Sequence, residues 1–163
     1  MIFKHILNKD NKVKEISNNY YFEILKFSNK IINTKNLELK KDFKVSFELV
    51  SLLMLIYITA IKDKKVKGYS QINQLIINNF ISDLDESLRK EGIGDMSIGK
   101  YVKSYVKKFY FRLSKFHEFY SKDKYHLYEK YLVHFDFIEE QNVKDLSKIL
   151  SNINKNLTNS ISY

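Results

Sequence analysis

Apolar residues recur every three or four positions along most of the chain. This spacing is typical of amphipathic helices, because residues three and four apart share one face of a helix. The pattern predicts helices over Val13–Ile32, Val45–Ile61, Gln71–Glu91 and Met96–Tyr120, followed by two more over 127–138 and 143–157. No stretch shows the alternation of a half-buried strand. We therefore expect an all-α fold, a compact bundle of five to six helices in one domain spanning 1–163.

The breaks between these helices have their own signals. The lysine-rich segment 33–41 predicts a loop, and Asp42 and Ser70 stand where the caps of the following helices are expected. The polar tail 154–163 is expected to be frayed. Proline is absent and only four glycines occur, so long stretches lack a strong helix breaker.

The segment Val45–Ile61 is the most hydrophobic part of the chain. It is slightly shorter than the span of about 20 apolar residues that a membrane helix normally needs. Glu48 near one end also opposes a position within a bilayer. We therefore interpret the segment as a central helix buried by its neighbours rather than as a transmembrane helix.

The segment Asp83–Phe116 predicts a helix end, a tight turn and a helix start. Asp85 and Arg89 stand at i and i+4, so they can pair on one face of a helix. Gly92 follows as the residue that enters the left-handed conformation after the helix. Asp95 is placed to cap the next helix.

The helix predicted over Met96–Tyr120 separates into two faces at 100° per residue. Its apolar face carries Ile98, Val102, Val106, Phe109, Leu113 and Phe116, with Tyr105 and Tyr110 at the margins. Its basic face carries Lys100, Lys103, Lys107, Lys108, Arg112 and Lys115. Tyr101 and Phe111 lie within the basic face, and no acidic residue occurs between Asp95 and Glu118. This face is either a solvated surface or a binding surface for an anionic partner.

Composition narrows the class of protein only slightly. The net charge of +9 favours anionic partners such as membranes, RNA or ribosomal surfaces, without choosing among them. Cysteine is absent, which excludes disulfides, thiol nucleophiles and cysteine-ligated zinc. The start Met1–Lys9 has no signal-peptide pattern, and its apolar residues are expected either to pack on the domain or to touch a membrane surface.

Candidate chemistry is sparse. The histidines His5, His117, His126 and His134 show neither a metal-binding spacing nor a nucleophile nearby. Asp83 and Asp85 point about 200° apart on a helix, so they cannot chelate one ion together. The Gly92–Gly94 pair follows a helix rather than a strand, which excludes a nucleotide-binding loop. We expect no enzyme, no catalytic residue, no metal and no cofactor.

The corner and the helix after it resemble a motif of the ubiquinol-cytochrome c chaperone family. In that family D-x-x-x-R-x-x-G-x-x-D-x-x-V-x-K-x-x-K is followed by F-Y-G-R-L. The matching residues are Asp85, Arg89, Gly92, Asp95, Lys100, Lys103, Phe109, Tyr110, Arg112 and Leu113. A looser resemblance covers about 20–137 and includes the run Phe47, Glu48, Leu49 and Leu52. The sequence departs from the family at Phe111, where glycine is usual, and at Leu53, where histidine is common.

The resemblance implies a non-enzymatic assembly chaperone. Family members bind newly made cytochrome b during biogenesis of the respiratory cytochrome bc complex, and mitochondrial relatives work with a small partner protein near the ribosome. We expect a bacterial, cytoplasmic protein that binds peripherally to the anionic surface of the inner membrane. We expect no specific DNA partner. The predicted client- or membrane-binding residues are Lys100, Lys103, Lys107, Lys108, Phe111 and Arg112. The motif residues expected to be mainly structural are Asp85, Arg89, Gly92, Asp95, Phe109 and Tyr110.

One alternative uses the same basic face for a different function. A basic helix with interspersed aromatic residues is also typical of an RNA- or ribosome-binding module. In that interpretation Tyr101 and Phe111 stack on bases, and binding to RNA weakens steeply with salt.

Overall fold

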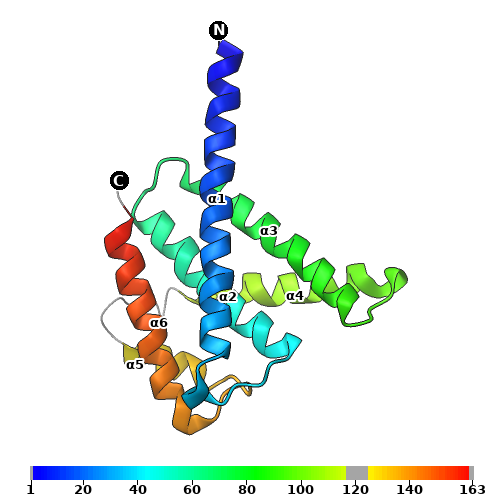
Figure 1. Cartoon of the computed structure of the whole chain (residues 1–163), viewed down its shortest axis with the longest axis vertical. Coiled ribbons are helices and arrows are strands. Elements are labelled where there is room, and N and C mark those ends of the chain that lie inside the picture. Colours follow the sequence, from blue (N-terminus) through cyan, green and yellow to red (C-terminus); the bar gives the residue numbers. More distant parts are fainter. Residues whose placement is uncertain (1, 117–124, 162–163) are drawn as a thin grey trace.

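The computed structural model of the chain describes residues 2–116 and 125–161, with side chains from residue 11 onward. Within these residues the chain is helical and has no strand, which confirms the predicted all-α fold (Figure 1). The elements are α1 (Ile2–Ile32), η1 (Lys35–Leu37), α2 (Phe43–Asp63), α3 (Tyr69–Lys90), α4 (Asp95–Phe116), α5 (Tyr125–Leu132) and α6 (Glu140–Ser160). The predictions for Met1–Lys9, His5 and His117 concern side chains outside the described residues.

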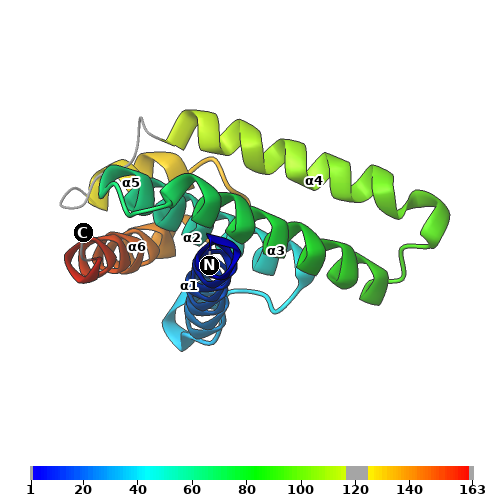
Figure 2. The same ribbon diagram turned by 90° about the horizontal axis from the view of Figure 1, so that it is seen from above.

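The helices are arranged around α2. This helix packs against α1, α3, α4 and α6, while α5 and α6 pack against each other. Figure 2 shows α4 running beside α3 along the outer edge of the bundle. One long side of α4 therefore faces away from the other helices, and this side becomes important for the candidate site.

The burial of α2 confirms its predicted central position. Among the described residues it is the one helix long and apolar enough to cross a membrane by length and composition. However, 83% of its apolar window is buried inside the bundle. The helix begins where predicted, because the Asp42 carboxylate accepts a 2.8 Å hydrogen bond from the backbone N–H of Val45. Asp42 is thus the cap of α2.

Other predicted boundaries differ from the structure. Helix α3 begins at Tyr69 after Gly68, whose φ of 78° is left-handed, so Ser70 lies inside the helix instead of capping it. Helix α5 ends at Leu132, earlier than predicted. Helix α6 continues to Ser160, although we expected a frayed tail after Asn154. The physical reason is that Asn154 is fully buried and donates a 3.0 Å hydrogen bond to the Tyr128 hydroxyl of α5.

Candidate functional site

The corner between α3 and α4 is fixed first by its backbone. Gly92 has a φ of 89°, which confirms its predicted left-handed conformation. Its N–H donates to the Arg89 carbonyl at 3.0 Å, and the Ile93 N–H donates to the Leu88 carbonyl at 3.1 Å. These two bonds satisfy carbonyl groups at the end of α3 and turn the chain toward α4.

Arg89 connects the two sides of this corner. Its Nε donates to Asp85 Oδ2 at 2.6 Å, which confirms the predicted pair, and its Nη1 donates to Asp95 Oδ1. These carboxylates, Asp85 first, raise the pKa of the Arg89 guanidinium. Asp95 is the first residue of α4, and the backbone N–H of Ile98 bonds the Gly94 carbonyl instead. The predicted capping role of Asp95 is therefore wrong, because its side chain turns back to Arg89.

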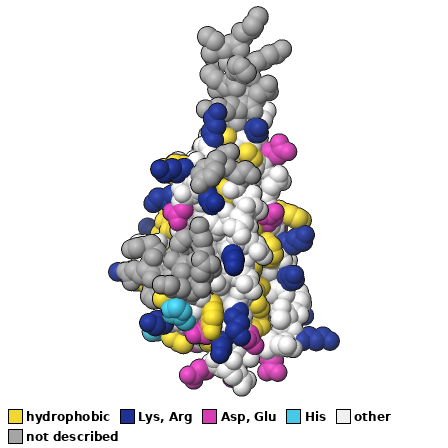
Figure 3. All heavy atoms as spheres, turned by 90° about the vertical axis from the view of Figure 1, so that its left-hand side faces the viewer, with side chains coloured by type: hydrophobic (Ala, Val, Ile, Leu, Met, Phe, Trp, Pro, Cys, Tyr) yellow, Lys and Arg dark blue, Asp and Glu magenta, His cyan; other side chains and the backbone are white. Residues whose placement is uncertain are grey.

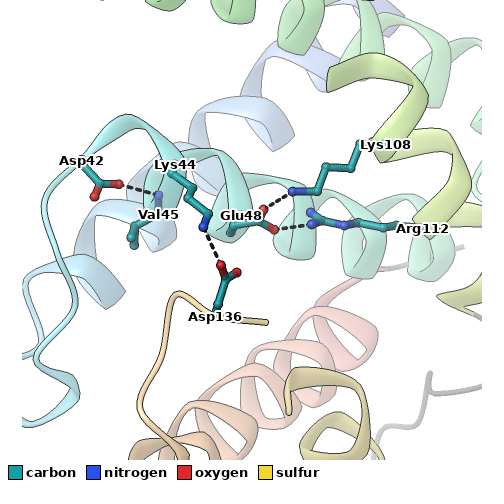
Figure 4. Close-up of polar contacts among 7 residues, drawn as sticks. All are labelled: Asp42, Lys44, Val45, Glu48, Lys108, Arg112 and Asp136. Carbon is teal, nitrogen blue, oxygen red and sulfur yellow. Dashed lines mark hydrogen bonds and ion pairs between the residues drawn. The ribbon is translucent and has the colours of Figure 1, made fainter. Parts of the chain in front are cut away.

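A buried charge cluster joins the other end of α4 to α2. Glu48 is only 2% exposed, and its Oε1 accepts a 2.6 Å hydrogen bond from Lys108 Nζ (Figure 4). Arg112 Nη2 lies 2.5 Å from Glu48 Oε2, and the guanidinium lies over the ring of Phe135, 4.6 Å from its centroid. Arg112 is itself 7% exposed. The cluster holds α4 against α2 and against the segment that follows α5.

This cluster corrects the predicted basic face. We expected Arg112 to face outward with the lysines, but it lies about 60° from the centre of the buried face at 100° per residue. Its long side chain reaches Glu48 from that border position. Lys108 is half-exposed and shares the same carboxylate. The one sequence signal for this arrangement was Glu48, an acid within the most hydrophobic segment of the chain.

A second ion pair anchors the same end of α2. Lys44 Nζ donates to Asp136 Oδ2 at 2.7 Å, which links the first turn of α2 to the segment between α5 and α6 (Figure 4). The hydrogen bond raises the pKa of the Lys44 ammonium and lowers the pKa of the Asp136 carboxyl. The pair is exposed, so it contributes little to the stability of the fold.

The outward side of α4 carries cations and exposed apolar side chains together. We call this surface the α4 stripe: it consists of Met96, Lys100, Lys103, Lys107 and Phe111. At 100° per residue these five residues lie within about 80° of the helix circumference. Met96 is fully exposed, and Phe111 is 67% exposed. In the described part of the chain none of the three lysines has an ion-pair partner.

Positive charge alone does not distinguish this stripe. Lys and Arg side chains are also spread over another face of the bundle, the one that carries α6, as Figure 3 shows. What distinguishes the α4 stripe is that apolar side chains remain exposed at both of its ends. The neighbouring motif residues differ from one another, since Phe109 is fully buried whereas Tyr110 is 44% exposed.

A groove between α1 and α3 has the opposite character. Its inner part is a cleft of about 210 Å³, and its outer part, of about 530 Å³, continues along the same two helices. We call the two parts the α1–α3 groove. Its apolar lining consists of Phe22, Leu25, Phe43, Phe47, Val50, Phe80 and Leu84. Its polar lining consists of Asn18, Asn19, Ser28, Asn29, Ser46, Asn79, Ser82, Ser87 and the Tyr21–Asp83 pair.

No lysine or arginine belongs to that lining, although the chain carries a net charge of +9. The Tyr21 hydroxyl donates a 2.9 Å hydrogen bond to Asp83 Oδ2 where the two parts of the groove meet. Burial, and after it the Asp83 charge, raises the pKa of Tyr21. Sequence reasoning did not find this groove, because three helices that are separate in the chain build it.

Metal-binding and catalytic candidates are few in the described structure. No group of three or more histidine, aspartate or glutamate side chains is close enough there to hold a metal ion. His126 and His134 lie at the start of α5 and just after its end. The features that the structure does assemble are two contrasting surfaces, one cationic and one without a lysine or arginine. Fold and surfaces together define a helical protein with two chemically distinct surfaces.

Comparison with known proteins identifies its family. The family model described as "Ubiquinol-cytochrome C chaperone" matches residues 35–131, and the chain belongs to this family. This result confirms the resemblance in the motif. The chain is also similar in fold to the crystal structure of the Cbp3 homolog from Brucella abortus, with a TM-score of 0.80 and 20% sequence identity. That match covers 99% of this chain and 90% of the other. No curated protein matched the sequence.

The matched range locates the features described above. It contains the α3–α4 corner, the whole of α4 and the Glu48 cluster. Family membership supports a chaperone role in assembly of the cytochrome bc complex, and such a role is non-enzymatic. The client- or membrane-binding role of Lys100, Lys103, Lys107, Lys108, Phe111 and Arg112 stays a prediction, and the burial of Arg112 makes it the least accessible of the six.

Proposed function

We propose that the protein binds newly made cytochrome b and holds it during biogenesis of the cytochrome bc complex. The observation that carries this proposal is membership of the ubiquinol-cytochrome C chaperone family over 35–131. Cytochrome b is a membrane protein, so its newly made helices expose apolar surface with few charges. A chaperone for such a client needs an apolar docking surface that does not require a charged partner.

The α1–α3 groove has these properties. Its floor is made of Leu25, Val50, Phe80 and other apolar side chains, and its polar lining is almost entirely serine and asparagine. Small polar residues allow helices to approach closely and can hydrogen-bond to a backbone within an apolar surface. We therefore place an apolar helical segment of the client in this groove.

The α4 stripe serves the membrane in this proposal. Anionic lipids attract lysine side chains, and each cation near the surface contributes about 1 kcal/mol of binding. Lys100, Lys103 and Lys107 point outward together, with Met96 and Phe111 available to enter the interface. The protein then lies on the cytoplasmic side of the inner membrane as a peripheral protein, close to where the client is inserted. A ribosome contact and a small partner protein are compatible extensions of this placement.

The test uses the native host and purified protein together. Deletion of the gene is expected to lower spectrally detected b-type haem and the amount of assembled bc complex. Replacing Leu25 with Lys places a charge in the groove and is expected to reproduce the deletion. The matched control is Lys26→Ala, which changes an exposed neighbour outside the groove. Normal b-type haem and normal complex in the deletion strain would refute the proposal.

A binding experiment separates the proposed client from nucleic acid. Purified protein is offered synthetic cytochrome b helices and a structured RNA at one ionic strength. We expect binding of the peptides that the Leu25→Lys variant loses. Tighter binding of RNA, lost instead in a Lys103→Glu variant, would favour the RNA- or ribosome-binding module.

A further inference from the structure

We infer that the α1–α3 groove selects an apolar helix that carries one lysine or arginine, and that Asp83 makes this selection by pairing with the cation. The inference rests on the proposed function, in which the groove holds a helix of the client, and it names the chemistry of the segment that fits best. An apolar helix without a cation still binds, but less tightly. Asp83 thus determines specificity within the docking surface.

Asp83 lies where the two parts of the groove meet. The lining that both parts share consists of Tyr21, Leu25 and Asp83. Asp83 is half-buried, so its carboxylate faces the groove but is only partly surrounded by solvent. A charge pair formed at such a place is screened less than a pair on an open surface. A cation that enters the groove therefore gains more from Asp83 than from an exposed acid.

The carboxylate of Asp83 is held in place but has no cation. The Tyr21 hydroxyl donates a 2.9 Å hydrogen bond to Oδ2, which orients the side chain. An ionised carboxylate offers about four acceptor sites, so this bond uses only one of them. Among the described residues no lysine or arginine forms an ion pair with Asp83. Lys90, two turns further along α3, donates to Glu86 at 2.6 Å instead.

The rest of the groove decides which class of partner fits. Asp83 is the one charged residue in the lining of either part, although the chain carries a net charge of +9. A nucleic acid or an anionic lipid would meet a negative charge there and no positive one. An apolar helix with a single cation complements both the apolar floor and the carboxylate, so charge complementarity favours this occupant.

Membrane helices supply this combination at one of their ends. Lysine and arginine are concentrated beside the cytoplasmic ends of such helices. The long stem of either side chain can lie along an apolar surface while its charged group reaches a carboxylate. Phe22, which is 69% exposed in the outer part of the groove, extends the apolar surface available to the stem. The segment that fits best is therefore the cytoplasmic end of a membrane helix.

The test compares three synthetic helices for binding to the full-length protein. The peptides share one amphipathic sequence, with leucine on one face and serine on the other, and differ only at the centre of the leucine face. That position is lysine, glutamine or glutamate, and binding is measured by fluorescence anisotropy. We expect the lysine helix to bind about tenfold more tightly than the glutamine helix, and the glutamate helix to bind most weakly. Equal binding of the lysine and glutamine helices, or no binding of the lysine helix, would overturn the inference.

Variants assign the selection to one carboxylate. Asp83→Asn keeps an acceptor for the Tyr21 hydroxyl but removes the charge, and it is expected to bind the lysine and glutamine helices equally. Asp83→Lys is expected to reverse the order, so that the glutamate helix binds most tightly. Glu86→Gln is the matched control, because it removes the same charge one turn away on α3, outside the groove lining. This control is expected to keep the full preference for lysine, and circular dichroism establishes that each variant is folded.

Other results would contradict the selection in distinguishable ways. Loss of the preference in Glu86→Gln as well as in Asp83→Asn would show diffuse attraction instead of a pair with Asp83. Binding of acetyl-lysine amide as tight as that of the lysine helix would assign the groove to a small cationic molecule. Equal binding of all three helices, lost in Leu25→Lys, would exclude selection by charge while keeping the groove as a docking surface. The gene-deletion experiment tests the proposed function separately.

Discussion

The two ends of α4 both carry arginine–carboxylate contacts, yet these contacts lie in opposite environments. At the first end, Arg89 bridges Asp85 and Asp95, and its side chain is 45% exposed. At the other end, Arg112 meets Glu48 with exposures of 8% and 2%. Exposed ion pairs contribute little, whereas removal of one partner from a buried pair leaves a charge without solvent. The same pair of chemical groups therefore contributes little to stability at the exposed corner, whereas in the core the loss of either group is strongly destabilising.

The largest expected effect comes from breaking the buried contact. Glu48→Leu leaves Arg112 buried without its carboxylate and is expected to lower the free energy of unfolding by about 3–5 kcal/mol. The double variant Glu48→Leu with Arg112→Met removes both charges and is expected to recover most of that loss. Urea unfolding of the three proteins measures the difference. A double variant no more stable than Glu48→Leu would show that the charges do not act as a pair.

The next effect concerns the backbone of the corner. Gly92→Ala forces an L-residue to a φ of 89° and is expected to cost about 1–2 kcal/mol. No atom lies within 4 Å of the added methyl group, so the loss reports backbone strain alone. Gly99→Ala is the matched control, because it also has open space but lies inside α4. That change is expected to stabilise the protein by about 0.5–1 kcal/mol, and equal effects of the two changes would contradict the assignment.

An intermediate effect is expected from the half-buried contact in the groove. Tyr21→Phe removes the hydrogen bond to Asp83 and is expected to cost about 0.5–1.5 kcal/mol at neutral pH. The pKa of Tyr21 is raised on folding, so above its ordinary value of about 10 the unfolded chain releases the proton first. Stability then falls as pH rises above about 10. Chemical unfolding at pH 8 to 11 is expected to show that the free energy of unfolding falls less steeply with pH for Tyr21→Phe than for the unchanged protein. Identical slopes would contradict a contribution of this contact to the pH dependence of stability.

The smallest expected effect is the loss of the exposed bridge. Arg89→Ala removes both contacts across the corner, and any destabilisation is expected to disappear at high salt because exposed charges are screened. Amide hydrogen exchange around Ile93 is the sensitive measurement, and faster exchange is expected there. Lys90→Ala is the control, since its pair with Glu86 stays within α3. A loss as large as that of Glu48→Leu would abolish the distinction between the two ends of α4.

Local features of the fold could be predicted from the sequence. Helical spacing located the main helices, and the cap at Asp42, the left-handed Gly92 and the pair of Asp85 with Arg89 each depend on residues close together in the chain. Such features are decided by the geometry of one or two helical turns.

The features that could not be predicted depend on contacts distant in the chain. A helical projection places Arg112 beside the lysines, but it does not show that Glu48 lies opposite Arg112 on another helix. Asp95 has the residue type of a cap, yet Arg89 from the preceding helix competes for its carboxylate. The α1–α3 groove forms only when three helices pack together, so no single segment of the sequence carries a pattern that predicts it.

The burial of α2 has a consequence for the order in which the chain is synthesised. Lys108 lies 60 residues beyond Glu48, so α2 leaves the ribosome well before the partners of its carboxylate. During that interval α2 has the length and hydropathy of a membrane span, and the unpaired carboxylate opposes its transfer into a bilayer. We therefore expect Glu48 to disfavour membrane insertion of the newly made helix before it becomes the partner of Arg112 in the folded protein.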